Sequence, residues 1–199
     1  MKYGEIERTK LPDGVDGIKF TVSRMIKMIQ EGRKDPLVIS TARKISALST
    51  GDRKFSEVDR AEHQLRGIHA WCRANFSFVR DPVGIELIQT PNRMLRELEI
   101  PPQLHKAIWR QMGNVSVISK MPKPKMTGDA DEATVISLSL AAAIGIDPLR
   151  IRLGGTDGTI HTCWGAAHTG GKWRDLNILE EKFGSRGPVK MLGEIDVPI

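Results

Sequence analysis

The segment 127–134 reads Thr-Gly-Asp-Ala-Asp-Glu-Ala-Thr and has the pattern of a helix start. Asp129 is a favourable N-cap residue, and Glu132 three positions later completes a capping-box pattern. Ala130 therefore falls in the first helical turn, near free main-chain N–H groups and the positive end of the helix dipole. A cysteine there would have a stabilised thiolate, as a nucleophile requires, whereas the methyl group of alanine cannot attack a substrate.

A histidine and two oxygen-bearing side chains follow in the chain. His161 lies in the apolar-rich segment 160–166, and Asp175 and Asn177 follow Trp173. An imidazole can take a proton from a thiol, and a carboxylate or an amide oxygen can orient the imidazole. Asp175 and Asn177 are two positions apart, which places them on one face of a strand. His161 alone would be read as a structural histidine; only the order of the three motifs indicates a catalytic arrangement.

These motifs resemble those of transglutaminase-like proteins in the papain-type cysteine-enzyme superfamily. In that family Gly-Asp-Cys-Asp or Gly-Asp-Cys-Glu opens a buried helix, and His and Asp follow on two strands. The tetrapeptide at 128–131 matches with alanine in place of cysteine. The resemblance implies that Ala130 stands at the nucleophile, His161 at the general base and Asn177 at the orienting residue, with Asp175 as the alternative orienting residue.

The segments 69–76, 79–84 and 87–91 look like the helical lead-in of transglutaminase-like proteins encoded by tailed phages. The matched segments together cover about 55–98 and 126–180. The stretch 99–125 resembles an insertion. We therefore expect a single domain over 1–199, with a helical lead-in at 15–98, an insertion or linker at 99–125 and a transglutaminase-like core at 126–199.

Alanine at position 130 has two explanations, a natural loss of the nucleophile or an engineered Cys→Ala change. Asn177 in place of the usual aspartate favours natural loss, because silencing the thiol requires no change in the orienting residue. Cys163 is not a replacement nucleophile, since a strand lacks the helix dipole and the thiol would lie about 7 Å from His161 on the same strand face. We expect Cys163 to be a packed core thiol. A zinc site formed by His161, Cys163 and His168 would need ligands from both faces of the strand, so we expect no metal and no cofactor.

The periodicity of apolar residues predicts the elements that position these side chains. Apolar positions recur every three or four residues in 18–29, 38–48 and 58–72, which predicts three helices, the last with Ser56 as its N-cap and Cys72 on its buried face. Short elements follow: an extended segment at 76–80, a helix from Pro91, and a second helix from the Pro-Pro at 101 to about 112. Alternation at 149–153, a loop at 154–158 and strands around Gly170-Gly171 predict an antiparallel sheet. The fold class is therefore α+β, with helices first and the sheet last.

Composition and charge limit the classes of partner. The two cysteines are too few for a disulfide framework, no run of about 18 apolar residues predicts a membrane span, and synthesis in a reducing cytoplasm is expected. Residues 1–125 carry 23 Lys and Arg against 14 Asp and Glu, whereas 126–199 carry 7 against 10. Nucleic-acid binding by the basic part, with Lys120, Lys123 and Lys125 as contacts, remains an alternative to a solvated helical surface.

The leading expectation is a catalytically inactive transglutaminase-like protein that binds other protein chains. The phage resemblance implies a virion or assembly component that binds phage structural proteins, with synthesis in the host cytoplasm and a final place in the virion. The enzyme alternative is the Cys→Ala form of a cysteine peptidase or acyltransferase that acts on peptide amides through a thioester.

Overall fold

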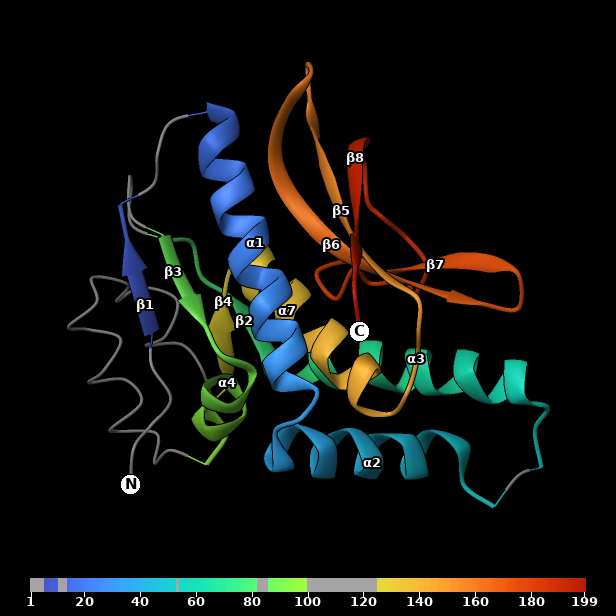
Figure 1. Cartoon of the computed structure of the whole chain (residues 1–199). Helices are drawn as coiled ribbons and strands as arrows, with labels where there is room; N and C mark the ends of the chain where they lie inside the picture. Colours follow the sequence, from blue (N-terminus) through green and yellow to red (C-terminus); the bar gives the residue numbers. More distant parts are fainter. Residues whose placement is uncertain (1–5, 11–13, 53, 82–85, 100–124) are drawn as a thin grey trace.

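The computed structural model describes residues 6–10, 14–52, 54–81, 86–99 and 125–199, which adopt an α+β fold as predicted (Figure 1). The described helices are α1 (Gly14–Gly32), α2 (Pro36–Thr50), α3 (Glu57–Asn75), α4 (Pro91–Glu97) and α7 (Ala130–Ala143). The described strands are β1 (Ile6–Thr9), β2 (Phe76–Phe78), β3 (Glu86–Gln89), β4 (Met126–Gly128), β5 (Leu149–Thr156), β6 (Thr159–Thr169), β7 (Lys172–Leu176) and β8 (Lys190–Val197).

The largest sheet is antiparallel with the strand order β7-β6-β5-β8. Two smaller pairs lie beside it: β1 with β3, which is antiparallel, and β2 with β4, which is parallel. The four-stranded sheet follows all the described helices, as predicted, and β2 lies in the predicted extended segment at 76–80. The strands β1, β3 and β4, which lie before or between the helices, were not predicted. These strands have only three or four residues each, too short to give a clear alternating pattern.

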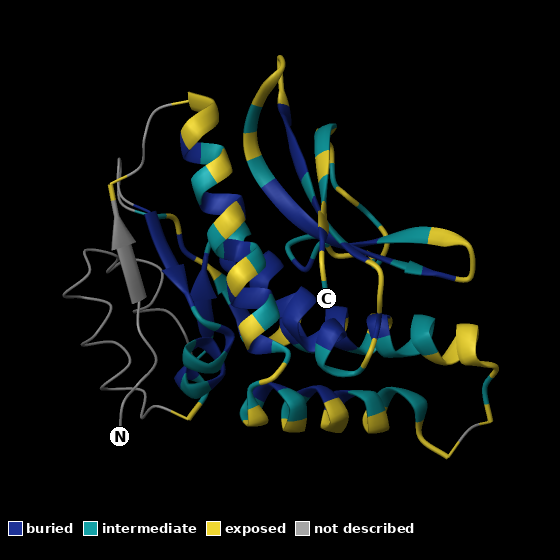
Figure 2. Ribbon diagram, viewed as in Figure 1, coloured by how far each residue is buried: buried dark blue, intermediate teal, exposed yellow. Residues whose placement is uncertain are grey.

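Helix α7 is the centre of the molecule (Figure 2). Every residue from Glu132 to Ala142 is buried, because α1, α2, α3, α4 and strand β6 all pack around the helix. An α-helix that is apolar on all sides is stable only when it is enclosed in this way. None of the described helices, α7 included, has both the length and the apolar character needed to cross a membrane.

Helix starts follow the predicted capping residues. Ser56 accepts the main-chain N–H of Asp59 at the start of α3, and Thr90 caps α4 with Pro91 at the first helical position. Two predicted core positions are wrong: Leu48 is 83% exposed on α2 and Val58 is 50% exposed on α3. Both lie near the ends of α2 and α3 that face away from α7, where less of the protein covers the helix (Figure 1).

Two tight turns shape the large sheet. Gly170 and Gly171 both have positive φ angles and join β6 to β7, as predicted for a two-residue hairpin. The predicted loop at 154–158 is wrong, because β5 continues to Thr156 and only Asp157 and Gly158, again with positive φ angles, form the turn. Asp-Gly is itself a hairpin signal. Because of the two glycines before it, at 154 and 155, the end of the strand was predicted as a loop.

Candidate functional site at the start of helix α7

The start of α7 is a complete capping box. The Asp129 carboxylate accepts the main-chain N–H of Asp131 at 2.9 Å, and Glu132 Oε2 accepts the main-chain N–H of Asp129 at 2.9 Å. The predicted caps are confirmed, and Ala130 is the first residue of the helix. Gly128 makes this arrangement possible, because a Cβ atom there would lie 2.5 Å from the Cβ of Glu132.

Buried polar side chains hold the strand that leads into the helix. Glu97 Oε2 accepts both the main-chain N–H and the hydroxyl of Thr127, and Gln89 Nε2 donates to the carbonyl of Thr127 at 2.8 Å. Glu132 Oε1 accepts the main-chain N–H of Gln89, which ties α7 to β3. Because these groups are buried, their hydrogen bonds fix the position of Ala130 more strongly than surface contacts would.

Ala130 faces a cavity of about 470 Å³. One wall comes from α1 and includes Ile18 and Met25; the opposite wall comes from β5 and β6 and includes Leu153 and His161. The full lining is Gly14, Gly17, Ile18, Thr21, Val22, Met25, Glu86, Asp129, Ala130, Asp131, Leu153, Ile160, His161, Thr162 and Cys163. The volume is that of a site for a small ligand or for one or two side chains of a partner.

His161 lies on this cavity at a β-bulge. Gly154 pairs with Thr162 and Gly155 with Ile160, so His161 has no partner on β5. A bulge of this kind changes the direction of a side chain relative to regular alternation. The ring is held by Thr156, whose main-chain N–H donates to His161 Nε2 at 3.0 Å. Since Nε2 accepts this hydrogen bond, the neutral ring carries its proton on Nδ1.

Asp175 is engaged on the other side of the sheet. Its Oδ1 accepts the indole N–H of Trp164 at 2.7 Å and forms an ion pair with Arg152. Trp164 directly follows Cys163 on β6, so the two side chains point to opposite faces, and Cys163 is the one that contacts α7. Asp175 is therefore separated from Ala130 by the sheet and anchors Trp164.

Asn177 also has partners other than His161. Its side-chain oxygen accepts the main-chain N–H of Leu179 at 3.1 Å, and its carbonyl is 3.1 Å from Nε2 of the buried His69. Asn177 thus shapes the turn after β7 and connects it to α3. Of the four sequence-predicted site residues, the structure brings Ala130 and His161 to one cavity and places Asp175 and Asn177 outside its lining.

Cys163 lies opposite the helix start, where sequence reasoning placed no functional group. Its thiol donates to Asp131 Oδ1 at 3.0 Å and lies 3.4 Å from the hydroxyl of Thr134. Burial, and then the adjacent Asp131 carboxylate, raise the pKa of the Cys163 thiol well above its usual value. The prediction of a packed thiol is confirmed, and its proton is held by a carboxylate.

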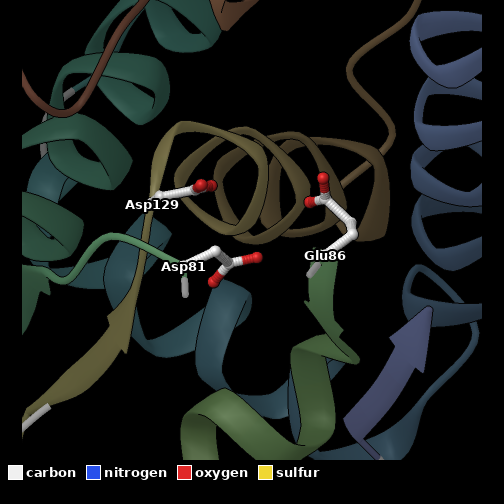
Figure 3. A group of neighbouring side chains, drawn as sticks. All are labelled: Asp81, Glu86 and Asp129. Carbon is white, nitrogen blue, oxygen red and sulfur yellow. The ribbon is translucent and has the colours of Figure 1, made fainter. Parts of the chain in front are cut away.

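Carboxylates gather around the same helix start (Figure 3). One oxygen from each of Asp81, Glu86 and Asp129 lies within 4.8 Å of the others. Burial is the main cause that raises the pKa of Asp81 to about 6, of Asp129 to about 7 and of Glu86 to about 9, and neighbouring carboxylates raise them further. Burial also raises the pKa of Asp131, against hydrogen bonds with Cys163 and Glu86 that lower it, and burial together with the neighbouring aspartates raises the pKa of Glu132. This part of the cavity is therefore strongly acidic.

Sequence reasoning missed Asp81 and Glu86 as site residues. They lie 48 and 43 positions before Asp129 and in no recognisable ligand spacing, so only the fold brings them together. His168 packs edge-on against Trp173, with ring centroids 5.4 Å apart, at the far end of β6 from His161. Cys72 is fully buried on α3, as predicted.

A second cavity, of about 650 Å³, lies where α3 ends, lined by Arg73, Phe76 and Phe78 among others. Its lining includes none of the four predicted site residues Ala130, His161, Asp175 and Asn177. The predicted helix from 101 to 112 and the Lys120 and Lys123 of the nucleic-acid alternative lie outside the described residues.

No family model, no curated protein and no solved structure matches this chain.

Proposed function

We propose that this chain is a catalytically inactive transglutaminase-like protein that binds a segment of another protein in the cavity at the start of α7. The observation that carries the proposal is that Ala130 and His161 line one cavity. The cavity thus contains a helix start and an imidazole, but the first residue of the helix carries a methyl group and no nucleophile. The virion setting and phage structural partners rest on the sequence resemblance.

The charged groups around the cavity support the proposal that the site has no catalytic activity. A cysteine nucleophile needs surroundings that favour its thiolate. Around Ala130, however, burial already raises the pKa values of Asp129 and Asp131, and repulsion by Asp131 raises that of Asp129 further. A thiolate at position 130 would add another negative charge to this group, which would offset the helix dipole. The existing thiol in the cavity, Cys163, is held in its protonated form by burial and then by the same carboxylates, which raise its pKa.

The lining favours a particular kind of protein segment. Ile18, Val22 and Met25 line the cavity with apolar side chains from α1, while Glu86 and Asp131 contribute carboxyl groups to the same cavity. A segment with an aliphatic side chain next to a lysine or an arginine would match both parts. The carboxylates would then be paired, which buried charges require.

The chemical part of the proposal is tested with an Ala130→Cys variant and a Ser40→Cys control, whose cysteine is exposed on α2. Each is treated with iodoacetamide at pH 6 and pH 8 and then with a library of peptide amides. We expect alkylation at residue 130 to be no faster at pH 6 than at residue 40, with no turnover of peptides. Rapid alkylation at pH 6 followed by turnover would instead establish the enzyme alternative, in which Ala130 silences a working site.

The binding part is tested by selection from a displayed peptide library. We expect enrichment of peptides in which a basic residue neighbours an aliphatic one. Ile18→Asp should weaken a selected peptide at least about 10-fold, because it places a charge on the apolar wall. The matched control is Val15→Asp on the same helix, where Val15 is 65% exposed and outside the lining. Equal effects of the two substitutions would exclude the cavity as the binding site.

A further inference from the structure

The carboxylates of Asp81, Glu86 and Asp129 come from three separate parts of the chain and converge at the start of α7 (Figure 3). Asp81 follows β2, Glu86 begins β3 and Asp129 caps α7. In Figure 3 the carboxylates of Asp81 and Asp129 point toward that of Glu86. Among the described residues, no lysine or arginine forms an ion pair with any of the three.

Two of the three carboxylates are already held in place. The main-chain N–H of Leu87 donates to Asp81 Oδ2 at 2.5 Å, and that of Asp131 donates to Asp129 Oδ1 at 2.9 Å. Hydrogen bonds of this kind orient the ligands of a metal ion and reduce the cost of collecting them. The orientation of Asp81 and Asp129 is therefore fixed by the backbone before any ligand arrives.

Glu86 supplies an independent indication of a ligand. Its side chain is only 9% exposed, and its Oε1 atom is buried without a hydrogen-bond partner in the described part of the chain. A buried carboxylate oxygen without a partner costs free energy comparable to a lost charged hydrogen bond. Because the Glu86 carboxylate is turned toward the other two, a cation among them would give this oxygen its partner.

The spacing of the oxygens indicates the class of cation. One oxygen from each residue lies within 4.8 Å of the other two. Calcium binds oxygen at about 2.3 to 2.6 Å, so two of its ligands can lie up to about 5 Å apart, whereas magnesium ligands at about 2.1 Å lie at most about 4.2 Å apart. The arrangement therefore suits calcium without movement of the carboxylates.

We propose that Asp81, Glu86 and Asp129 form a binding site for a divalent cation with the size and oxygen preference of Ca²⁺, opening on the cavity that contains Ala130. The ion takes one oxygen from each carboxylate and fills its remaining positions with water. This goes beyond the proposed protein binding, because the ion binds whether or not a peptide segment occupies the cavity. Its two positive charges also offset part of the negative charge of the carboxylates, so it weakens the attraction of basic segments.

Calcium binding is measured by titration calorimetry on the full chain after treatment with EDTA, with CaCl₂ and, separately, MgCl₂ as titrants. We expect one calcium per chain with a dissociation constant between about 10 μM and 1 mM, and at least about 10-fold weaker magnesium binding. Thermal unfolding in about 10 mM CaCl₂ should shift upward by about 3 °C or more. No binding heat and no shift at that concentration would overturn the proposal.

The site is assigned with Glu86→Gln and, as a matched control, Asp52→Asn, a carboxylate that is exposed in the turn after α2. Glu86→Gln should bind calcium at least about 10-fold more weakly and lose the thermal shift. Its fold is checked by its unfolding midpoint in EDTA, which should not fall, because glutamine has the size of glutamate and keeps a side-chain oxygen and a hydrogen-bond donor. If the Glu86→Gln variant binds calcium as tightly as the parent, the ion binds elsewhere and this site is refuted. Since no peptide is present, the result is independent of the test of protein binding.

Discussion

The thiol of Cys163 on β6 donates a hydrogen bond to the carboxylate of Asp131 in the first turn of α7, over 3.0 Å. This contact joins the large sheet to the start of the central helix, beside Ala130. The thiol of Cys163 therefore faces the helix start, and His161 lines the same cavity. Carboxyl groups and a protonated thiol therefore lie at the start of α7.

We expect the charge of Asp131 to keep Cys163 unreactive. In the native protein, iodoacetamide at pH 8 should label Cys163 far more slowly than it labels an exposed cysteine, because burial and Asp131 hold the thiol pKa high. Asp131→Asn should increase the labelling rate several-fold, since it removes the nearest negative charge. Labelling is followed by peptide mass spectrometry. An unchanged rate in Asp131→Asn would mean that burial alone protects the thiol.

Asp175 should behave as a structural anchor for Trp164 and Arg152. Asp175→Ala should lower the free energy of unfolding by about 2 to 4 kcal/mol, because it leaves the guanidinium of Arg152, which is 12% exposed, without its ion-pair partner on β7. Urea denaturation measures this loss. The ring resonances of His161, followed by NMR at one pH, should keep their chemical shifts. Shifted His161 ring resonances in this variant would support an orienting role for Asp175 instead.

Gly165 should be required for the packing of β6 on α7. A Cβ atom at this position would lie 2.7 Å from Cδ2 of the fully buried Leu138, so Gly165→Ala should cost about 1 to 3 kcal/mol of stability. Gly193→Ala in β8 is the control, since the nearest atom, on Leu153, would be 3.9 Å away. Both variants are compared by urea denaturation. Equal losses would show that the cost comes from the strand backbone and not from contact with α7.

His69 should make the protein less stable in mild acid. Burial lowers its pKa below the usual value of about 6.5, so the folded state binds fewer protons than the unfolded state. Its contribution is present above pH 6.5 and is lost as the pH falls toward the folded pKa, at up to about 1.4 kcal/mol per pH unit. His69→Gln, which keeps a donor for the Asn177 carbonyl, should lose less stability between pH 7.5 and 5.5 than the parent.

The comparison for His69 is made in EDTA, with His63→Gln as a control on the same helix. His63 packs against the ring of Phe55 and is partly exposed. The change in pH dependence caused by His69→Gln is judged against the change caused by His63→Gln. If the two changes are equal, the imidazole of His69 does not contribute to acid sensitivity.

The helical elements and the hairpin at Gly170 could be predicted because their signals are local. Capping residues such as Ser56 and Thr90, and apolar residues at helical spacing, act within a few positions of one another. Strands β1, β3 and β4 could not be predicted, because their three or four residues pair with segments far away in the chain, whereas β2 lies within the predicted extended segment at 76–80. Leu48 and Val58 were wrongly predicted to be buried for a related reason. The periodicity of apolar residues identifies which face of a helix is buried, but not how far along that face the core extends.

The candidate site was predictable only in part. The helix start around Ala130 is a local motif, and the structure has the expected capping box there. The position of His161 depends on a bulge that the sequence does not mark, and Asp81 and Glu86 reach Asp129 only through the fold. The partners of Asp175 and Asn177 also depend on the packing of the sheet, which periodicity cannot specify.

The burial of α7 on every side has a consequence for how the chain folds. The hydrophobic core runs without a break from Val22 to Val197, and α7 touches helices from the first half and strands from the second. Neither half can cover this helix alone. We expect fragments 1–99 and 126–199 to be separately unfolded and to regain structure when mixed, so that the chain behaves as one cooperative unit whose two halves are complementary.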